Sequence, residues 1–238
     1  MPANTPQEAM AEGSTSPRPP LRLLLLNRNT SQQATALMLA VARRVAPPGV
    51  GVEACNLPDG EALITETDSL ARAALGVADH APKLLRGRCD GVIVAGFGDP
   101  GLQPLQLAFG LAVTGLGEAG IRAAAEGGRR YAIVTVTPQL HDSLVQAAHR
   151  HAPPQLLAGV RYTRGRPQDL VNSPQALADA LLEACEAAVR LDGAESIVIG
   201  GGPLAAEADS LSAQLAVRVV NPVSAAVRLA CARLGASV

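Results

Sequence analysis

Short apolar runs alternate along this chain with longer alanine-rich stretches, and this alternation constrains the fold more than any other feature. The runs are mostly Val, Ile and Leu without polar alternation, as expected of strands buried on both faces. They are Leu21–Leu26, Val50–Ala54, Gly91–Ala95, Leu111–Gly115, Tyr131–Val136, Ser196–Ile199 and Val217–Val220. The stretches between them have helical character, and the main ones are Ser31–Val45, Asp68–Leu85, Pro138–His149 and Pro174–Leu191. Strand–helix alternation predicts an α/β fold with parallel sheets.

The chain also repeats itself. The segment DGVIVAGFGDPGLQPLQLAFGLAVTGLGEAGIRAA begins at Asp90, and AESIVIGGGPLAAEADSLSAQLAVRVVNPVSAAVRLA begins at Ala194. Both run strand, glycine turn, proline, helix, strand and second helix, and Gly96 and Gly201 occupy matching places 105 residues apart. Such a repeat predicts two similar α/β lobes. Because ligands bind at the carboxyl ends of strands in these sheets, we expect one cleft between the lobes.

The domain organisation follows from these patterns. Residues 1–20 are rich in Pro, Ser, Thr and Glu, which predicts a disordered tail. The first lobe is predicted over 21–115 together with 215–238, and the second over 116–214. We expect the last helix, Val223–Leu234, to pack on the lobe that contains the first strand.

Charge and composition exclude several classes of protein. A formal net charge of −1 and only four aromatic residues argue against a nucleic-acid partner. No apolar stretch approaches the roughly 20 residues that span a membrane. The four cysteines are widely spread, and neither they nor the four histidines show metal-ligand spacing. The sequence therefore predicts a cytoplasmic protein that binds no metal, nucleic acid or membrane.

Small and polar residues follow several predicted strands. Thr30, Ser31 and Asp99 suit helix N-caps, and glycines allow a ligand to approach free backbone N–H groups. Several such ends around one cleft predict binding of a carboxylate or phosphate, although the same residues also make ordinary turns. The residues at these ends that we expect to contact a ligand include Phe97, Gly98, Thr135, Thr137, Gly202 and Pro203.

One of these turns matches a dinucleotide motif. Gly96, Gly98 and Gly101 have the GxGxxG spacing after a strand, but in the third strand unit. The nearest downstream acid, Glu118, follows Gly101 by 17 residues rather than the expected 20 or so. NAD binding is therefore disfavoured.

Three motifs resemble a known family. NRNTS after the first strand, VIVAGFGDPGL in mid-chain, and IVIGGGPLA followed by VRVVNPVSAAVRLA are similar to the aspartate/glutamate/hydantoin racemase superfamily, most of all to hydantoin and allantoin racemases. The resemblance covers Leu21 to about Leu234. It implies two Rossmann-like lobes related by pseudo-twofold symmetry, chemistry without a cofactor, and a small carboxylate or hydantoin-like ligand. Homo-oligomers are frequent among such proteins, so the oligomeric state stays open.

The resemblance also assigns roles to individual positions. It implies that Asn27, Asn29, Thr30 and Ser31 hold the carbonyl or carboxylate end of the substrate. Arg28 stands where the family usually carries proline.

The two catalytic cysteines of the family align with Gly96 and Gly201. Racemisation by two bases needs a thiolate on one face of the carbon acid and a thiol on the other, and glycine supplies neither. Arylmalonate decarboxylases keep the second thiol, which this chain also lacks. Cys55 ends a strand at the correct sheet edge, but one thiol cannot serve both faces.

Three functional readings remain open from the sequence. The first is an enzyme of the racemase superfamily, and the second is a ligand-binding or regulatory relative without chemistry. The third is a lyase or isomerase that uses Asp99, Glu118 or His141, although each suits an ordinary place near a helix start. Because the rest of the cleft reads as intact, we expect cysteines restored at Gly96 and Gly201 to create measurable racemisation.

Overall fold

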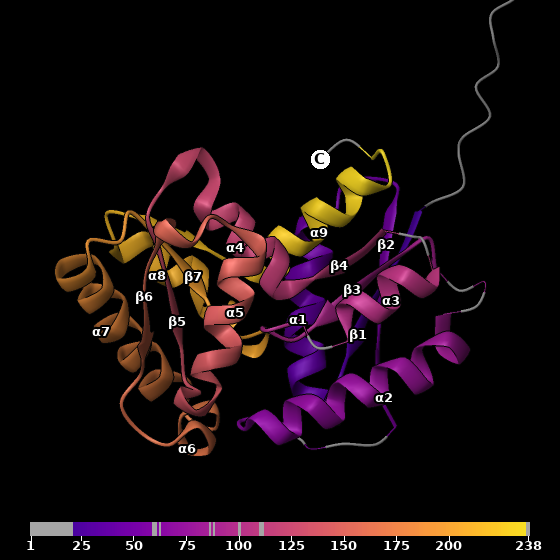
Figure 1. Cartoon of the computed structure of the whole chain (residues 1–238), viewed down its shortest axis with the longest axis horizontal. Coiled ribbons are helices and arrows are strands. Elements are labelled where there is room, and N and C mark those ends of the chain that lie inside the picture. The colour runs from indigo at the N-terminus through magenta and orange to yellow at the C-terminus, as the bar shows by residue number, and fades with distance from the viewer. Residues whose placement is uncertain are drawn as a thin grey trace, which may run out of the picture.

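The computed structural model (Figure 1) describes residues 21–58, 61, 63–85, 87, 89–99, 101–109 and 112–236. The tail predicted over residues 1–20 lies outside them. In these ranges the chain folds into two α/β lobes that lie side by side, each built on a four-stranded parallel sheet. The predicted fold class is therefore confirmed.

The two sheets have the same topology. The first has the order β2-β1-β3-β4 and the second the order β6-β5-β7-β8, so β1 corresponds to β5 and β3 to β7. The strands are β1 (Leu21–Asn27), β2 (Val50–Asn56), β3 (Gly91–Ala95), β4 (Ala112–Gly115), β5 (Tyr131–Thr135), β6 (Leu157–Tyr162), β7 (Ser196–Ile199) and β8 (Arg218–Val220). The internal repeat of the sequence is thus a repeat of the fold.

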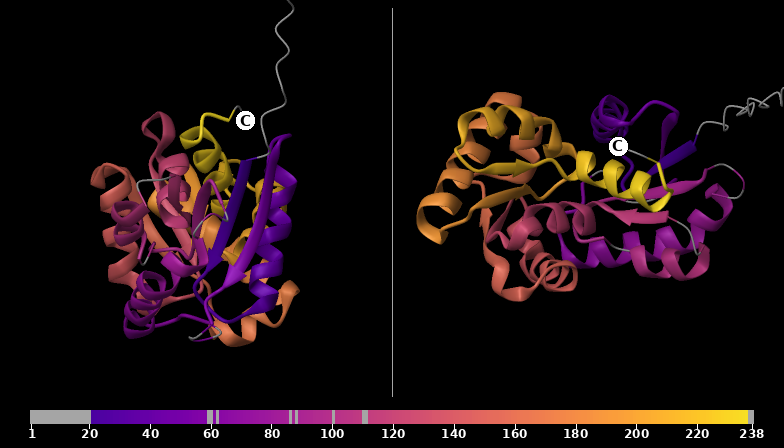
Figure 2. Two further views of the ribbon diagram at one scale, coloured as in Figure 1. Left: turned by 90° about the vertical axis from the view of Figure 1, so that its right-hand side faces the viewer. Right: turned by 90° about the horizontal axis from the view of Figure 1, so that it is seen from above.

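Helices cover the faces of both sheets (Figures 1 and 2). They are α1 (Gln32–Val45), α2 (Thr67–Leu85), α3 (Leu102–Phe109), α4 (Leu116–Ala125), α5 (His141–His151), α6 (Pro167–Val171), α7 (Pro174–Asp192), α8 (Ala208–Gln214) and α9 (Pro222–Arg233). Short 3₁₀ helices span Glu126–Gly128, Pro138–Leu140, Pro154–Leu156 and Pro203–Glu207. No helix within the described ranges is long and apolar enough to cross a membrane.

Local sequence explains most of these elements. The inner strands β3, β5 and β7 are buried along their whole length, as their unbroken apolar runs predict. Ser31 is an N-cap as predicted, because its hydroxyl accepts a hydrogen bond from the Ala34 N–H that begins α1. The edge strand β6 was not predicted. Its residues are all half-buried, and Gly159 and Arg161 interrupt the apolar pattern.

The last helix of each half lies where the lobes meet. Helix α4 contacts β7 and β8 of the second sheet, whereas α9 contacts β3 and β4 of the first and also packs on α4. Figure 2 shows α9, in yellow, leaving the second lobe and lying along the first. The prediction for the last helix is therefore confirmed. The boundary predicted at residue 215 is not, because β8 follows it and pairs with β7 in the second sheet.

One apolar core spans both lobes, and each lobe also has a smaller buried cluster of its own among the described residues. A single cluster of buried side chains includes Leu25 and Ile93 from the first sheet, Ile133 and Val198 from the second, and Val227 of α9. Because such a core is lost only as a whole, we expect the lobes to unfold together.

The start of α9 offers a test of this junction. Asn221 is buried; its Oδ1 accepts from the N–H groups of Val223 and Ser224, and its Nδ2 donates to the Ala205 carbonyl at 2.8 Å. Asn221→Ala removes a cap and leaves a buried carbonyl unpaired, so it should cost about 2 kcal/mol in urea unfolding. Ser31→Ala removes only the cap of α1 and should cost about 1 kcal/mol. Equal losses would contradict this account of Asn221.

Candidate functional site

A cavity of about 90 Å³ lies at the carboxyl ends of the inner strands of both sheets. This is the edge at which α/β sheets bind ligands. Its volume is below the roughly 300–1,000 Å³ of pockets for drug-sized molecules, so it fits a small ligand. The polar and glycine residues that line it are Asn27, Arg28, Asn29, Gly96, Thr135, Thr137, Gly200, Gly201 and Gly202. Apolar lining comes from Met38, Leu63, Ile64, Leu70, Ala95, Phe97, Val136, Leu140, Leu144, Val171, Pro203 and Leu204.

The loop after β1 is held by its own amide side chains. Asn27 Nδ2 donates to Asn29 Oδ1 at 2.9 Å and to Thr35 Oγ1 at 2.7 Å. Asn56 Nδ2, from β2, donates to the Asn29 carbonyl at 2.8 Å. Asn27 is 1% exposed, so its hydrogen bonds fix the loop from the buried side. Asn29 is half-buried and lines the cavity.

The second lobe repeats this arrangement after β5. Thr135 ends its strand as Asn27 ends β1, and Thr137 follows two residues later as Asn29 does. Thr135 Oγ1 donates to the Gly200 carbonyl at 2.7 Å and lies 3.3 Å from Thr137 Oγ1. The cavity therefore has hydroxyl groups on one side and amides on the other.

Arg28 places a cation in the cavity wall. The residue is 4% exposed, and its Nε donates to the Ala95 carbonyl at 3.1 Å. Its Nη1 is buried without a hydrogen-bond partner among the described residues. Desolvation lowers the pKa of Arg28 to about 9, although the Asp99 carboxylate opposes this shift. The guanidinium is therefore still charged at pH 7.

Two glycines occupy equivalent positions in the two lobes, Gly96 after β3 and Gly201 after β7, and both line the cavity. A Cβ built at Gly201 would lie 2.9 Å from the Cδ1 of Leu204, the flexible end of a side chain. A Cβ at Gly96 would overlap the guanidinium of Arg28. Arg28 therefore fills the space beside Gly96, and the sequence-based expectation that the rest of the cleft is intact stays a prediction.

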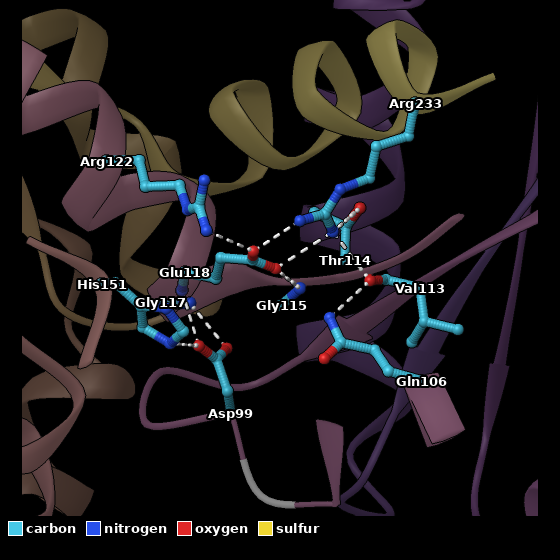
Figure 3. Close-up of polar contacts among 10 residues, drawn as sticks. All are labelled: Asp99, Gln106, Val113, Thr114, Gly115, Gly117, Glu118, Arg122, His151 and Arg233. Carbon is cyan, nitrogen blue, oxygen red and sulfur yellow. Dashed lines mark hydrogen bonds and ion pairs between the residues drawn. The ribbon is translucent and has the colours of Figure 1, made fainter. Parts of the chain in front are cut away.

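Asp99 and Glu118 lie outside this cavity, in the network of Figure 3. Asp99 has a φ of 52° and accepts from the N–H groups of Gly117 and Glu118, at 2.8 and 2.5 Å, so it caps α4 rather than the helix that follows it in sequence. His151 Nε2 lies 3.2 Å from its Oδ2. These contacts give Asp99 a structural role in holding α4.

Glu118 is a buried partner of the last helix (Figure 3). Its Oε1 lies 2.5 Å from Arg233 Nη2, and its Oε2 lies 3.1 Å from Nη1. Burial alone would raise the pKa of Glu118, but Arg233, with the Gly115 N–H and Arg122, outweighs burial and holds the pKa below its ordinary value of 4.5. The carboxylate is therefore charged at neutral pH and joins α4 to α9.

The remaining sequence candidates lie elsewhere. His141 Nδ1 is 2.6 Å from the Tyr162 hydroxyl on an exposed surface, and Ser31 caps α1. The Thr30 N–H donates to the Glu61 carbonyl at 3.2 Å, and Gly98 lies beside Asp99 in a separate open groove. None of these residues lines the cavity at the strand ends. Their predicted contacts with a ligand stay predictions.

The cysteines of the described chain place no thiol in the wall of the cavity. All four lie in the described part of the chain, and none lines the cavity. Burial raises the pKa of Cys185 to about 12 and also raises that of Cys231. Burial and the nearby Asp90 raise the pKa of Cys89. A thiol with a raised pKa stays protonated at neutral pH and is therefore a poor nucleophile.

The profile of the Asp/Glu/Hydantoin racemase family matches residues 23–230 of this chain. The chain belongs to that family. A hydantoin racemase of Paenarthrobacter aurescens is 29% identical over 211 residues, which cover 88% of this chain and 89% of the relative. The crystal structure of an allantoin racemase from Pseudomonas fluorescens superposes with a TM-score of 0.84 at 29% identity, covering 91% of this chain and 93% of that one. An allantoin racemase from Klebsiella pneumoniae gives a TM-score of 0.82 at 29% identity over 91% and 89% of the two chains.

Within this racemase-family fold, sequence reasoning missed some of the site. The sequence marks Arg28 only as a departure from proline, and it does not predict the apolar wall formed by Met38, Leu140 and Val171. Nothing local marks these residues, because they meet only when the strand ends of the two sheets come together. The glycines that follow the predicted strands indicate the edge of the sheets at which the cavity lies. They do not indicate which side chains line it.

Proposed function

We propose that this racemase-family chain binds a small carboxylate or a cyclic ureide in the cavity at the strand ends. The observation that carries the proposal is the lining itself, in which amide, hydroxyl and guanidinium groups from both lobes surround a small apolar-walled space. A few polar groups in an apolar pocket are typical of small-molecule sites. The named relatives are racemases of hydantoin and allantoin, which supports a ureide, whereas the charge of Arg28 favours a carboxylate.

We further propose that the chain does not racemise its ligand by a pair of thiols. Glycine occupies both positions that the family resemblance assigns to catalytic cysteines, Gly96 and Gly201. Proton removal on one face and delivery on the other need two titratable groups, and neither glycine has a side chain. In this proposal the protein is a ligand-binding relative that works in the cytoplasm and without a cofactor.

The alternative in which Asp99, Glu118 or His141 transfers a proton has less support. The first two carboxylates accept hydrogen bonds from α4 and Arg233, and His141 contacts Tyr162 away from the cavity. A base must reach the proton it abstracts, directly or through one water.

One experiment tests the proposal. The protein is titrated by calorimetry with hydantoin, allantoin, aspartate, glutamate and malonate, and loss of the α-proton of each compound in D₂O is followed by NMR. We expect saturable binding of at least one compound, and exchange no faster than with denatured protein. Binding of none of them would contradict the proposed site. Exchange above the control would contradict the loss of chemistry and make Asp99, Glu118 and His141 the next residues to mutate.

A further inference from the structure

Arg28 is a buried cation whose bonds are incomplete. Its Nε donates to Ala95, yet its Nη1 is buried with no partner in the part of the chain that the structure describes. Buried charged groups are normally paired, because desolvation is costly unless hydrogen bonds replace the lost water. Because Arg28 also lines the cavity, a ligand bound there can pair with this guanidinium after a small shift of the side chain.

The acid that acts most on Arg28 is already engaged. The electrostatic influence of Asp99 is felt at the guanidinium, but both carboxylate oxygens of Asp99 accept backbone N–H groups of α4, and His151 lies 3.2 Å from one of them. Asp99 therefore lessens the cost of the buried cation without completing its hydrogen bonds.

The place of Arg28 depends on Gly96. The register of β1 against β3 pairs Asn27 with Ala95, so Arg28 and Gly96 follow as neighbours at the same sheet edge. The guanidinium lies where the first atom of any side chain at position 96 would be. Only glycine at position 96 leaves room for this arrangement, so the two residues form one structural unit.

We propose that Arg28 binds the carboxylate of the ligand, so that this site selects a small carboxylic acid over a neutral ureide. The inference rests on the proposed function, since it requires that the cavity binds a ligand. A guanidinium presents two parallel N–H donors that match the two oxygens of a carboxylate, and such charge-assisted pairs are stronger than neutral hydrogen bonds. A neutral ureide would leave the buried charge uncompensated. The volume of about 90 Å³ favours a small acid.

With its carboxylate at Arg28, the ligand would present its other end to the second lobe. Thr137 and the Gly201–Pro203 turn line the opposite strand ends. The site would then hold its ligand between a cation from the loop after β1 and the hydroxyl of Thr137, with glycine on either side.

Calorimetry with matched probes tests this role. The probes are acetate, malonate and succinate, their primary amides acetamide, malonamide and succinamide, and hydantoin. The variants are Arg28→Met, which removes the charge, and Arg28→Lys, which keeps the charge without the paired donors. Arg43→Met is the matched control, because Arg43 also donates its Nε to a backbone carbonyl, that of Val52 at 3.1 Å, but is exposed and does not line the cavity.

We expect the wild type to bind at least one acid tenfold or more tightly than its amide. Arg28→Met should abolish this preference, Arg28→Lys should keep part of it, and Arg43→Met should leave it unchanged. If the wild type binds hydantoin or the amides as tightly as the acids, the role of Arg28 is overturned while the proposed function stands. If none of these probes binds, the role of Arg28 is overturned, and if allantoin, aspartate and glutamate also fail to bind, the proposed function is overturned with it. Should Arg28→Met fail to fold, Arg28→Lys carries the test, and an undiminished acid preference with that variant overturns paired recognition by the guanidinium.

Discussion

The variant Gly96→Cys/Gly201→Cys is expected to show no α-proton exchange, whereas the same variant with Arg28→Ala should exchange measurably. A side chain at Gly96 overlaps the guanidinium of Arg28, so a thiol there cannot take its place beside the substrate until Arg28 is removed. The φ of 159° at Gly96 is one that residues with a side chain rarely adopt, so Cys there also carries some backbone strain, whereas Leu204 needs only a small shift to admit a side chain at Gly201. Two positioned thiols then supply one acid–base group on each face of the carbon acid.

The measurement is deuterium incorporation into hydantoins substituted at the α-carbon, followed by NMR in D₂O. The triple variant should exceed the double variant by roughly a hundredfold, the lower end of what positioned acid–base groups contribute. Arg28→Ala alone is the control, and it should stay at background because it has no thiol in the cavity. A folded triple variant that binds the substrate and stays inert would show that more than Arg28 separates this cleft from a racemase site. Exchange by the double variant would show that Arg28 moves aside.

Arg233→Met is expected to be the most destabilising single substitution at the junction of the lobes, at about 3–5 kcal/mol. Glu118 is 3% exposed and holds its charge through two contacts with Arg233, so the substitution leaves a buried carboxylate with the weaker support of Arg122 and the Gly115 N–H. Arg233 also donates to the Val113 carbonyl at 2.8 Å. Arg228→Met, an exposed position on the same helix, should change stability by no more than about 0.5 kcal/mol in urea unfolding.

The pH dependence gives this prediction a second measurement. In the wild type the pKa of Glu118 is below 4.5, so its stabilising contribution is complete above pH 4.5 and is lost as the pH falls through the lowered pKa. Without Arg233, burial dominates and should raise the folded-state pKa above 4.5, so that protonation relieves the buried charge. The difference in stability between wild type and Arg233→Met should therefore be smaller at pH 5 than at pH 7. A difference that does not change with pH would assign the loss to packing rather than to the carboxylate.

Together these results would separate two things that the family fold combines. The strand-end cavity and the two-lobe frame belong to the fold, whereas in our proposal proton transfer would require side chains at Gly96 and Gly201. Function lies in such sites rather than in the fold that carries them.

The alternation of apolar runs and helical stretches determined the α/β class, the bounds of most strands and the repeat of the two halves. These features follow from local sequence, because a strand buried on both faces must be apolar along its length. The edge strand β6 could not be predicted in this way, because a half-buried strand carries no such apolar run. The lobe boundary predicted at residue 215 was misplaced, because the short strand β8 that follows it pairs with β7 of the second sheet. Glycines and polar residues at strand ends also indicated the correct edge of the sheets.

Only the tertiary structure decided which side chains meet at the carboxyl ends of the strands. Arg28 and Gly96 are 68 residues apart, and they meet because β1 and β3 pair in a register that aligns Asn27 with Ala95. Asp99 reads in sequence as the cap of the helix that follows it, yet it caps α4, since α4 begins beside the same turn. Glu118 finds Arg233 at the far end of the chain because α9 returns to the first lobe. The register of β1 against β3 and the return of α9 to the first lobe bring these charged groups together. Neither can be predicted from the local pattern of hydrophobic residues.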